Sequence, residues 1–422
     1  MNDKKKKFEN IYEQISFPKD WEPTSLSDVF DLRRETMVPT GIGNQRYIGL
    51  EHIDSGRMKI SRYGVESEIR SAKNKFYPDD ILYGKLRPYL DKSVLADIEG
   101  ICSTDILVFK VDKERILPRY GACLVHTSAF LQYVISTTTG VNHPRTSWSS
   151  IGKFRCSIPK LAEQSIIVHA LFILQQAIEH QEKIIEKTKE LKRSLMQRLF
   201  TYGLRGEELK ETEIGLMPEN WEIVEVGELG EIITGTTPPT KNKEYYTGGS
   251  YQFISPFDLG NTKYAYKTEK EISSKGLSVS RCLPKDAVLV VCIGSTIGKV
   301  GMTSKDKSAT NQQINTIVCD KKYNPHFVYY CLLFKSEYIR SLATPSPVPI
   351  MSKGKFQKAV ISIPANRDEQ DKIVEILSAI DEKVEKAQSR KHALQALFRS
   401  MLNLLMTGQV RVKDIDFGEA CE

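Results

Sequence analysis

The sequence predicts an α+β protein in which two α/β globules lie in an inverted pseudo-twofold arrangement, separated by two long antiparallel coiled-coil helices. Two repeats and a heptad pattern predict this class. The opening motif Pro-x-x-Trp at residues 18–21 returns at residues 218–221. An Ile-Pro pair followed by Glu-Gln begins at Ile158 and again at Ile363, and each pair introduces a heptad-patterned stretch. Such self-similarity indicates a chain built from two copies of one unit.

Composition places the chain among ordinary globular proteins. It has 422 residues, of which 40% are hydrophobic and 27% are charged, enough for two or three domains. We find no apolar run near the roughly 20 residues that cross a bilayer, and the basic N-terminus is followed by no apolar stretch of the kind found in signal peptides. We therefore expect a cytoplasmic protein without a membrane partner. The net charge of +7 is compatible with nucleic-acid binding but does not establish it.

Each globule reads as a mixed α/β segment. In the first, residues 17–157, strands are expected at 46–50, 80–83 and 105–111, where β-branched and aromatic residues lie between turn signals. In the second, residues 217–362, the clearest strands are at 251–254 and 287–292. Shorter helices are expected around residues 118–136 and 325–343.

The heptad stretches predict two long helices that pair with each other. Apolar residues recur at alternating steps of three and four, and the two series match position by position. Gln181, Thr188, Lys192 and Lys391 interrupt the series, which costs stability but helps to fix the register. The predicted apolar seam consists of Ile167, Leu171, Leu174, Ile178, Ile185, Leu195, Leu199, Ile373, Leu377, Ile380, Val384, Leu394, Phe398, Met401 and Leu405.

A helix of roughly 40 residues is about 60 Å long. Antiparallel pairing within the chain would place the globules at opposite ends about a pseudo-twofold axis. A coiled coil that only dimerises the protein is the alternative. Gly203 and Gly408 follow the last heptad residues, where a left-handed cap is expected.

Three segments resemble catalytic or cofactor-binding motifs but do not match them fully. Residues 294–299 have three residues between the glycines, and Val300 follows the lysine, so a tight turn exposing Lys299 is favoured over a phosphate-binding loop. Residues 324–327 lack the second proline of the amino-methyltransferase motif and read as a turn before a helix. Asp79 and Asp80 with Lys85 loosely suggest a nuclease, but such spacing is common in loops. The eight cysteines form no CxxC pair, and a zinc site or disulfide framework is not expected. No catalytic residue, bound metal or cofactor is predicted.

Polar and basic loops occur in matched pairs. Residues 84–89 with 103–105 correspond to 298–299 with 310–313, and residues 85–87 align roughly with 296–298; a second pair comprises 145–148 and 351–355. Lys and Arg neutralise phosphates or contact guanine, whereas Asn and Gln can pair with adenine. Asp105 could accept from cytosine or cap a strand. Ordinary solvated loops are the alternative. The candidate DNA-binding residues are Lys85, Arg87, Thr104, Arg145, Ser147, Thr296, Lys299, Asn311, Gln312, Ser352, Lys353 and Lys355.

These motifs, in this order and repeated twice, resemble the specificity subunit of type I restriction–modification systems over nearly the whole chain. The resemblance rests on the Pro-x-x-Trp openings, residues 80–87 with 102–105, residues 294–299 with 311–312, the Ile-Pro…Glu-Gln helix entries and residues 407–411. It implies target-recognition domains at 1–159 and 204–364, a central conserved helix at 160–203, a C-terminal conserved helix at 365–408 and a tail at 409–422.

The resemblance also implies a division of labour. Each recognition domain would read one half of a split double-stranded DNA target through the major groove, and the helices would set the length of the spacer. Two modification subunits would carry S-adenosylmethionine and the methylation chemistry, and two restriction subunits would carry ATP-driven translocation and Mg-dependent cleavage, so this chain would bind no cofactor itself. A self-contained methyltransferase or nuclease and a coiled-coil scaffold that binds only proteins are the competing hypotheses.

Overall fold

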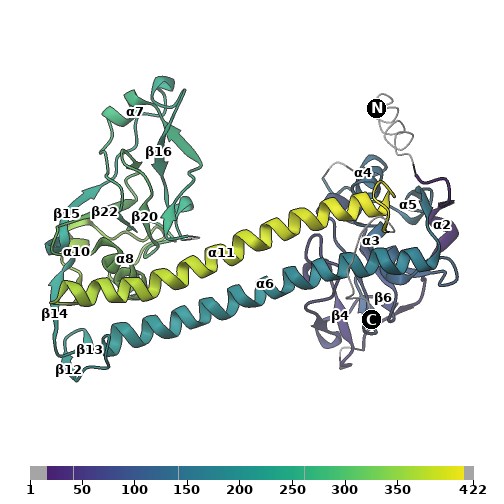
Figure 1. Ribbon diagram of the computed structural model, residues 1–422, viewed down its shortest axis with the longest axis horizontal. Helices are drawn as coiled ribbons and strands as arrows, with labels where there is room; N and C mark the ends of the chain where they lie inside the picture. The colour runs from purple at the N-terminus through teal and green to yellow at the C-terminus, as the bar shows by residue number, and fades with distance from the viewer. Residues whose placement is uncertain (1–16, 41, 141, 261, 413–422) are drawn as a thin grey trace. The chain divides into compact units, whose positions relative to one another are not determined.

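The computed structural model describes residues 17–40, 42–140, 142–260 and 262–412, which form two compact units (Figure 1). Unit 1 consists of Met1–Gln181 and Arg390–Glu422, and unit 2 of Glu182–Ser389. Each unit therefore contains one globule and about half of each long helix. The predicted α+β class, with two α/β globules and two long antiparallel helices, is confirmed. The domain boundaries drawn from the sequence set each helix apart from the globules, whereas the compact units divide both helices.

The globule of unit 1 is built on two sheets and one strand pair. Strand β1 (Glu22–Ser25) pairs antiparallel with β11 (Arg155–Ile158), which closes the globule just before the first long helix. The four-stranded sheet has the order β2 (Phe30–Leu32), β10 (Ile106–Val111), β7 (Ile81–Gly84) and β8 (Ser93–Leu95). The five-stranded sheet has the order β3 (Thr36–Met37), β6 (Lys73–Phe76), β9 (Gly100–Cys102), β4 (Arg46–Ile48) and β5 (Gly64–Val65).

Unit 2 repeats this plan with small changes. Strand β14 (Trp221–Glu225) pairs with β23 (Val360–Pro364), as β1 pairs with β11. A five-stranded sheet has the order β15 (Gly230–Thr234), β22 (Ile314–Cys319), β19 (Val288–Val291), β20 (Val300–Thr303) and β17 (Tyr264–Ala265). A three-stranded sheet has the order β18 (Lys270–Ile272), β16 (Tyr251–Ile254) and β21 (Ala309–Thr310). The hairpin β12 (Leu209–Thr212) and β13 (Gly215–Pro218) precedes β14.

The short helices lie where the sequence predicts them, but each predicted helix is two. Residues 118–136 form α3 (Pro118–Leu124) and α4 (Ser128–Ser136), because the Thr127 hydroxyl accepts from the Phe130 N–H and starts a new helix. Residues 325–343 form α8 (Pro325–Phe334) and α9 (Ser336–Ser341). The remaining helices are α2 (Leu26–Val29), α5 (Trp148–Ile151), α7 (Ser274–Ser278) and α10 (Lys353–Gln357), with short 3₁₀ turns at η1 (Leu50–His52), η2 (Glu66–Glu68), η3 (Pro88–Leu90), η4 (Val226–Leu229), η5 (Lys243–Tyr245) and η6 (Pro256–Asp258).

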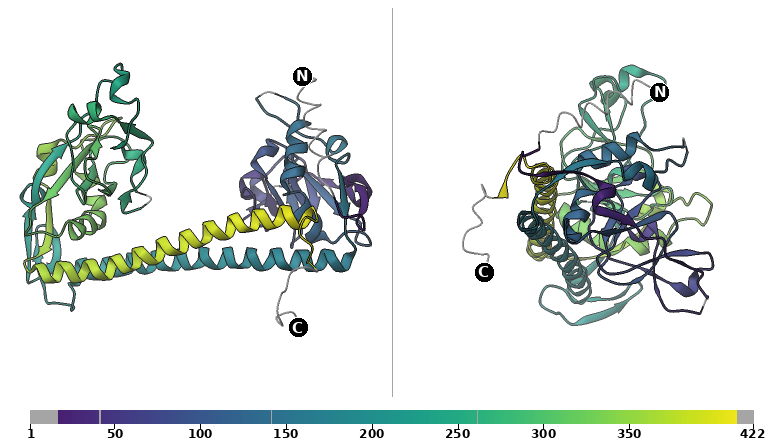
Figure 2. Two further views of the ribbon diagram at one scale, coloured as in Figure 1. Left: turned by 45° about the horizontal axis from the view of Figure 1, so that its top comes forward. Right: turned by 90° about the vertical axis from the view of Figure 1, so that its right-hand side faces the viewer.

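The long helices α6 (Leu161–Tyr202) and α11 (Arg367–Met406) run antiparallel (Figure 2). In unit 1 the beginning of α6 shares a core with the end of α11, through Ile167 and Leu405. In unit 2 the end of α6 shares a core with the beginning of α11, through Leu199 and Ile373. Every predicted seam residue is buried or half-buried, and so are the polar positions Gln181 and Thr188. By length and composition α6 could cross a membrane, but Ile167, Leu171, Ile178 and Leu199 of this helix belong to the cores of the two units.

Both long helices end at the predicted glycines. Gly203 has φ +70° and Gly408 has φ +68°, the left-handed region that glycine adopts without strain. A Cβ on Gly408 would lie 2.4 Å from Cγ of Pro18, and one on Gly203 would lie 3.3 Å from Cγ of Pro218. The end of each helix therefore packs closely against a Pro-x-x-Trp motif.

Candidate nucleic-acid interface

The repeated motifs join each globule to the long helices. The Trp21 indole N–H donates to Glu163 Oε2 at 3.3 Å, and the Trp221 indole N–H donates to Glu369 Oε1 at 3.0 Å. Both tryptophans are buried. The Glu of each Glu-Gln pair therefore binds the Trp of the opening motif. In unit 1, Arg411 adds ion pairs to Glu163 at 2.7 Å and to Asp20 at 2.8 Å.

The Gln of each pair positions a short helix of the globule. Gln164 Oε1 accepts from the N–H of Leu117 at 2.8 Å, one residue before α3. Gln370 Oε1 accepts from the N–H of Asn324 at 2.9 Å, one residue before α8. Both glutamine side chains are buried, and their amide groups donate to the carbonyls of Pro159 and Pro364. The shared motifs thus form an equivalent frame in both units.

Backbone hydrogen bonds establish which loop residues are equivalent on this frame. The Gly84 N–H donates to the Lys92 carbonyl at 2.8 Å, and the Val291 N–H donates to the Lys299 carbonyl at 2.9 Å. The loop at 85–91 therefore corresponds to 292–298. The expected alignment of 85–87 with 296–298 is wrong, because it places the second loop four residues too late. Lys85 corresponds to Cys292 and Arg87 to Gly294.

Two further segments meet each loop. The Arg87 N–H donates to the Pro144 carbonyl at 2.8 Å, and the Gly294 N–H donates to the Pro349 carbonyl at 2.9 Å. The Lys85 N–H donates to the Asp105 carbonyl at 2.9 Å, as the Cys292 N–H does to that of Gln313 at 2.8 Å. We call residues 84–91, 103–105, 139–140 and 142–147 the first loop cluster. Residues 291–298, 311–313 and 344–355 are the second loop cluster.

The first loop cluster is charged. The Asp105 carboxylate lies 3.3 Å from Arg145 Nε and 4.0 Å from Lys85 Nζ, so it pairs with cations of both neighbouring segments. It does not act simply as a strand cap. Arg87 is exposed and makes no hydrogen bond or ion pair through its guanidinium with the described residues. Thr104 and Ser147 are also exposed at this cluster.

The second loop cluster is built mainly from amides and hydroxyls. Asn311 Nδ2 donates to Gln313 Oε1 at 3.0 Å, and Gln313 Nε2 donates to the Ile293 carbonyl at 3.3 Å. Gln312 is exposed, and its Oε1 accepts from the Thr237 hydroxyl at 2.6 Å. Segment 103–105 therefore occupies the place of 311–313, with Asp105 opposite Gln313. Thr296 is half-buried in the loop itself.

The basic residues of the second cluster lie on α10. Ser352 is its N-cap, and its hydroxyl accepts from the Lys355 N–H at 3.3 Å. Lys353 and Lys355 are exposed. Ser147 occupies the equivalent N-cap position before α5. In each globule, the structure thus brings the candidate DNA-binding residues into one loop cluster. Lys299 is the exception.

Lys299 points into the globule. It is half-buried, and its Nζ lies 3.3 Å from the carbonyl oxygens of Pro256 and Leu259. The equivalent Lys92 donates to the Leu50 carbonyl at 2.5 Å. Both lysines therefore support the turn after an equivalent strand. That Lys299 binds DNA stays a prediction, and these contacts favour a structural role instead.

Sequence reasoning missed several residues of the clusters. Tyr89 is 52% exposed in the first cluster and Ile350 is 45% exposed in the second. A single exposed apolar side chain is common on protein surfaces, so neither residue carries a signal that the sequence could have revealed. Thr237 meets the second cluster from a distant segment, through the bond from its hydroxyl to Gln312.

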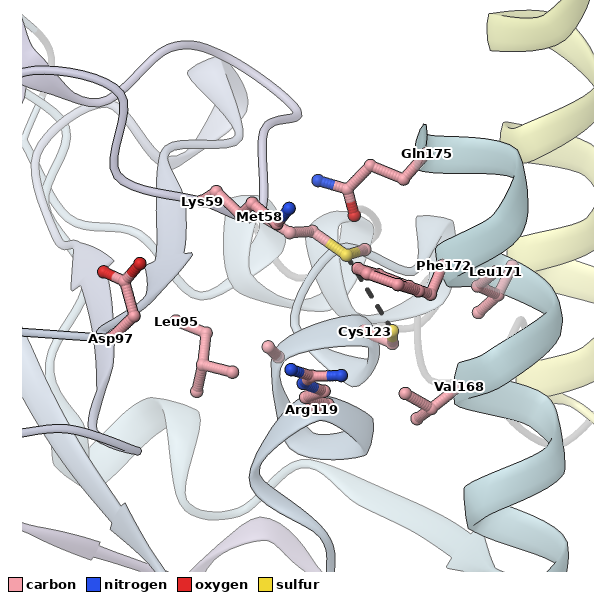
Figure 3. Close-up of a pocket in the computed structure, with 11 residues that line it drawn as sticks. Met58, Lys59, Leu95, Asp97, Arg119, Cys123, Val168, Leu171, Phe172 and Gln175 are labelled. Carbon is pink, nitrogen blue, oxygen red and sulfur yellow. Dashed lines mark hydrogen bonds between the residues drawn. The ribbon is translucent and has the colours of Figure 1, made fainter. Parts of the chain in front are cut away.

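A cavity of about 290 Å³ in unit 1 lies between part of the globule and α6 (Figure 3). Its walls are mostly apolar, and Met58, Cys123 and Phe172 line it. In unit 2 the equivalent positions are Lys263, Tyr330 and Ser378. Lys263 Nζ lies 3.4 Å from both the Tyr330 hydroxyl and the Ser378 hydroxyl. A polar cluster therefore takes the place of the cavity.

We call Lys192, Lys263, Tyr330, Ser378 and Asp381 the Tyr330 cluster. The Tyr330 hydroxyl donates to Asp381 Oδ2 at 2.6 Å, and Lys192 Nζ lies 2.6 Å from Asp381 Oδ1. Burial lowers the pKa of Lys263 to about 8, although the nearby Asp381 opposes this shift. The second globule thus has a charged cluster at the positions where the first globule has Met58, Cys123 and Phe172.

The described residues form no metal cluster, and most of their thiols are buried. Within the ranges described above, no three His, Cys, Asp or Glu residues gather where they could hold a metal ion. Burial raises the pKa of five thiols to about 12, which keeps them protonated at neutral pH. These thiols belong to Cys123, Cys156, Cys292, Cys319 and Cys331.

Comparison with known proteins agrees with this architecture. Residues 18–190 and 218–396 each match the family model described as the type I restriction modification DNA specificity domain. The putative type I restriction enzyme MjaX specificity subunit of Methanocaldococcus jannaschii is 26% identical, and the match covers 94% of this chain and 95% of that protein. The type I restriction enzyme HindI specificity subunit of Haemophilus influenzae is 24% identical, with 82% and 93% covered.

Solved structures show the same fold. The type I restriction-modification system S subunit from M. genitalium superposes with a TM-score of 0.59 at 14% identity, covering 91% of this chain and 96% of that one. The two family-model matches coincide with the two copies of the frame, and each match includes one loop cluster.

Proposed function

Because this chain belongs to the type I restriction–modification DNA specificity family, and is a specificity subunit of such a system, we propose that it reads an asymmetric, bipartite DNA target. Each globule would read one half-site with its loop cluster. The observation that carries this proposal is the pairing of one backbone frame with two different sets of side chains. The first cluster presents Arg87, Lys85 and Arg145, and the second presents Asn311, Gln312 and α10 lysines.

The chemistry of the clusters suits DNA. Arg contacts guanine through two parallel hydrogen bonds, whereas Asn and Gln pair in the same way with adenine. Lysines at the rim neutralise phosphates and position the protein without reading sequence. Since equivalent positions carry different donors and acceptors, the two half-sites should differ in sequence.

The long helices would set the spacing between half-sites and hold the partner subunits. α6 has 42 residues and α11 has 40, so each spans about 60 Å, between one and two turns of duplex DNA. Apolar side chains remain exposed along both helices, where partner subunits would cover them. They are Ile166, Ile173, Leu191, Ile376 and Leu397.

We further propose the assembly and location that such a role requires. Two modification subunits would supply S-adenosylmethionine-dependent methylation, and two restriction subunits would supply ATP- and Mg-dependent translocation and cleavage in the cytoplasm. This chain would contribute recognition only. Purified chain given DNA and S-adenosylmethionine should therefore transfer no methyl group, and measurable turnover would favour a self-contained enzyme.

Methylation-sensitive sequencing of the host genome tests the proposed function. We expect a split target with two unlike halves and a fixed spacer, lost when the gene for this chain is deleted. A coiled-coil scaffold that binds only proteins predicts no sequence preference when the chain and its methyltransferase partner are tested by gel shift. Methylation that is unchanged by deletion contradicts the proposal.

A further inference from the structure

The two equivalent loops share a backbone that needs two left-handed residues. In the second loop these are glycines, Gly294 with φ +100° and Gly298 with φ +88°. In the first loop the same two positions hold Arg87 with φ +51° and Asp91 with φ +49°. Residues other than glycine rarely adopt this conformation, because Cβ comes too close to the backbone carbonyl. Strain of this kind persists only when surrounding contacts hold it in place, and it is concentrated at functional sites.

Asp91 is held by His126. Oδ1 of Asp91 lies 2.8 Å from Nδ1 of His126, and the Gly56 N–H donates to the Asp91 carbonyl at 2.8 Å. The other ring nitrogen, Nε2, lies 3.1 Å from the carbonyl oxygen of Ser93. The His126 side chain is 3% exposed. A buried ring with a polar partner at each nitrogen has a fixed orientation, and it holds the Asp91 side chain beside it.

The second loop has no such pair. Gly298 stands where the first loop has Asp91, and a Cβ there would lie 2.7 Å from the carbonyl oxygen of Ser336. Leu117 and Asn324 are equivalent, because each is bound by the Gln of a helix entry. His126 comes nine residues after Leu117, and the residue nine positions after Asn324 is Leu333, which packs against the apolar core. Glycine lets the second loop adopt this backbone unaided, whereas the first loop depends on a side-chain contact.

Arg87 is what the strained loop presents. It is the N-cap of η3, and Asp91 is the C-cap, so the two left-handed residues bracket one short turn. The Arg87 backbone is fixed at its other side by the Pro144 carbonyl. Its side chain is exposed and free of described partners, as a group that contacts DNA requires.

We propose that His126 and Asp91 are positioning residues that hold Arg87 in place for contact with the first half-site. Neither residue touches DNA itself. The proposal rests on the proposed function, since it names the device that fixes one reading loop. It predicts that the two half-sites depend differently on the pair.

The test uses the complex of this chain with its methyltransferase partner. Duplexes carry both half-sites of the sequenced target, or one half-site with the other scrambled. The first half-site is identified as the one whose affinity falls in the Arg87→Ala variant. Variants D91A and D91G both remove the carboxylate, but only glycine tolerates the left-handed backbone. Comparison of H126L with H126L/D91G shows whether glycine at position 91 restores the affinity for the first half-site that is lost with the histidine.

We expect D91A and H126L to weaken binding to the first half-site about tenfold. D91G and H126L/D91G should stay within about threefold of wild type, because glycine adopts the loop conformation unaided. Affinity for the second half-site should be unchanged in all four variants. Should H126L fail to assemble, the comparison of D91A with D91G decides, since Asp91 is only half-buried.

Two results overturn the positioning role: D91A binding the first half-site like wild type, or D91G binding it as poorly as D91A. Equal losses at both half-sites would also overturn it. If the wild-type complex shows no sequence preference at all, the proposed function fails instead.

Discussion

The first and second loop clusters differ in side chains and agree in backbone. Equivalent hydrogen bonds connect 85–91 and 292–298 to their neighbours, and both loops turn through two left-handed residues. The first loop cluster carries charged residues on this backbone, and His126 holds its loop in place. The second loop cluster carries glycines, amides and hydroxyls on the equivalent backbone. Under the proposed function, a backbone that tolerates such different side chains would allow one chain to read two unlike sequences.

The contrast extends to the face turned toward the helices. Unit 1 leaves a cavity beside α6, and unit 2 fills the equivalent place with the Tyr330 cluster. The parts that do not differ are the Trp–Glu contact and the buried Gln at each helix entry. The comparison therefore separates a common frame from two sets of variable contents, and the following experiments test that separation.

Lengthening the common helices should have the largest effect on target choice. We expect one heptad inserted into each helix, between residues 181 and 182 and between 389 and 390, to abolish methylation of the original target. The same half-sites should be methylated at a spacer about three base pairs longer, since a heptad adds about 10 Å. Methylation sequencing reads the spacer directly. A change in either half-site would contradict the assignment of spacing to the helices.

Removing a frame tryptophan should destabilise either unit alike. Trp21→Ala and Trp221→Ala each delete a buried indole and its bond to Glu163 or Glu369, at a cost of about 3–5 kcal/mol in unfolding free energy. Equilibrium denaturation measures both, with the Phe variants as controls that keep most of the packing. A loss confined to one copy would break the claim of a common frame.

Arg87→Ala should act on one half-site only. We expect binding to weaken by roughly 1–3 kcal/mol and specificity to relax at a position in that half, if Arg87 reads a base. Arg155→Ala, an exposed arginine on β11, is the matched control. Unchanged affinity together with an unchanged methylated sequence would rule out this role.

The Tyr330 cluster should make the stability of unit 2 depend on pH. Lys263 has a pKa of about 8 when folded and its ordinary value of 10.5 when unfolded. Between these values the unfolded chain binds more protons, so stability should rise as pH increases from about 8 toward about 10, where tyrosines begin to titrate. Lys263→Met, which copies Met58 of the first globule, should raise stability at pH 7 and remove this rise.

Thermal unfolding across this pH range measures the effect, with exposed Lys305→Met as control. A Lys263→Met protein that is less stable than wild type at pH 7 would show that its contacts with Tyr330 and Ser378 outweigh the cost of burial.

Lys299→Ala should change specificity least. Its Nζ binds carbonyl oxygens inside the globule, so we expect a loss of about 1 kcal/mol in stability and no change in the methylated sequence. Lys92→Ala is the matched variant in unit 1. An altered second half-site would restore Lys299 as a DNA contact.

The features that the sequence predicted correctly are those that repeated motifs and heptad periodicity indicate. The two copies, the long helices and the left-handed caps at Gly203 and Gly408 follow from local patterns that packing reinforces. Loop equivalence did not follow, because residues 292–294 share no residue type with 85–87. The placement of Lys299 depends on a strand turn that no local pattern reveals.

Contacts between distant residues were also hidden from the sequence. His126 and Asp91 are 35 residues apart and belong to different elements, and nothing in either segment signals the other. Asp105 was read as a base contact or a strand cap because its partners Lys85 and Arg145 come from separate segments. Tertiary pairing, rather than propensity, decides such positions.

Exchange of one loop tests most directly whether the variable contents carry sequence reading. Residues 85–91 are replaced by the sequence of residues 292–298, which has the same length and backbone, and the methylated genome is sequenced. We expect one half-site to change or relax, while the other half-site and the spacer stay as they were. A target that is unchanged, or changed in both halves, would contradict the separation of a common frame from its contents.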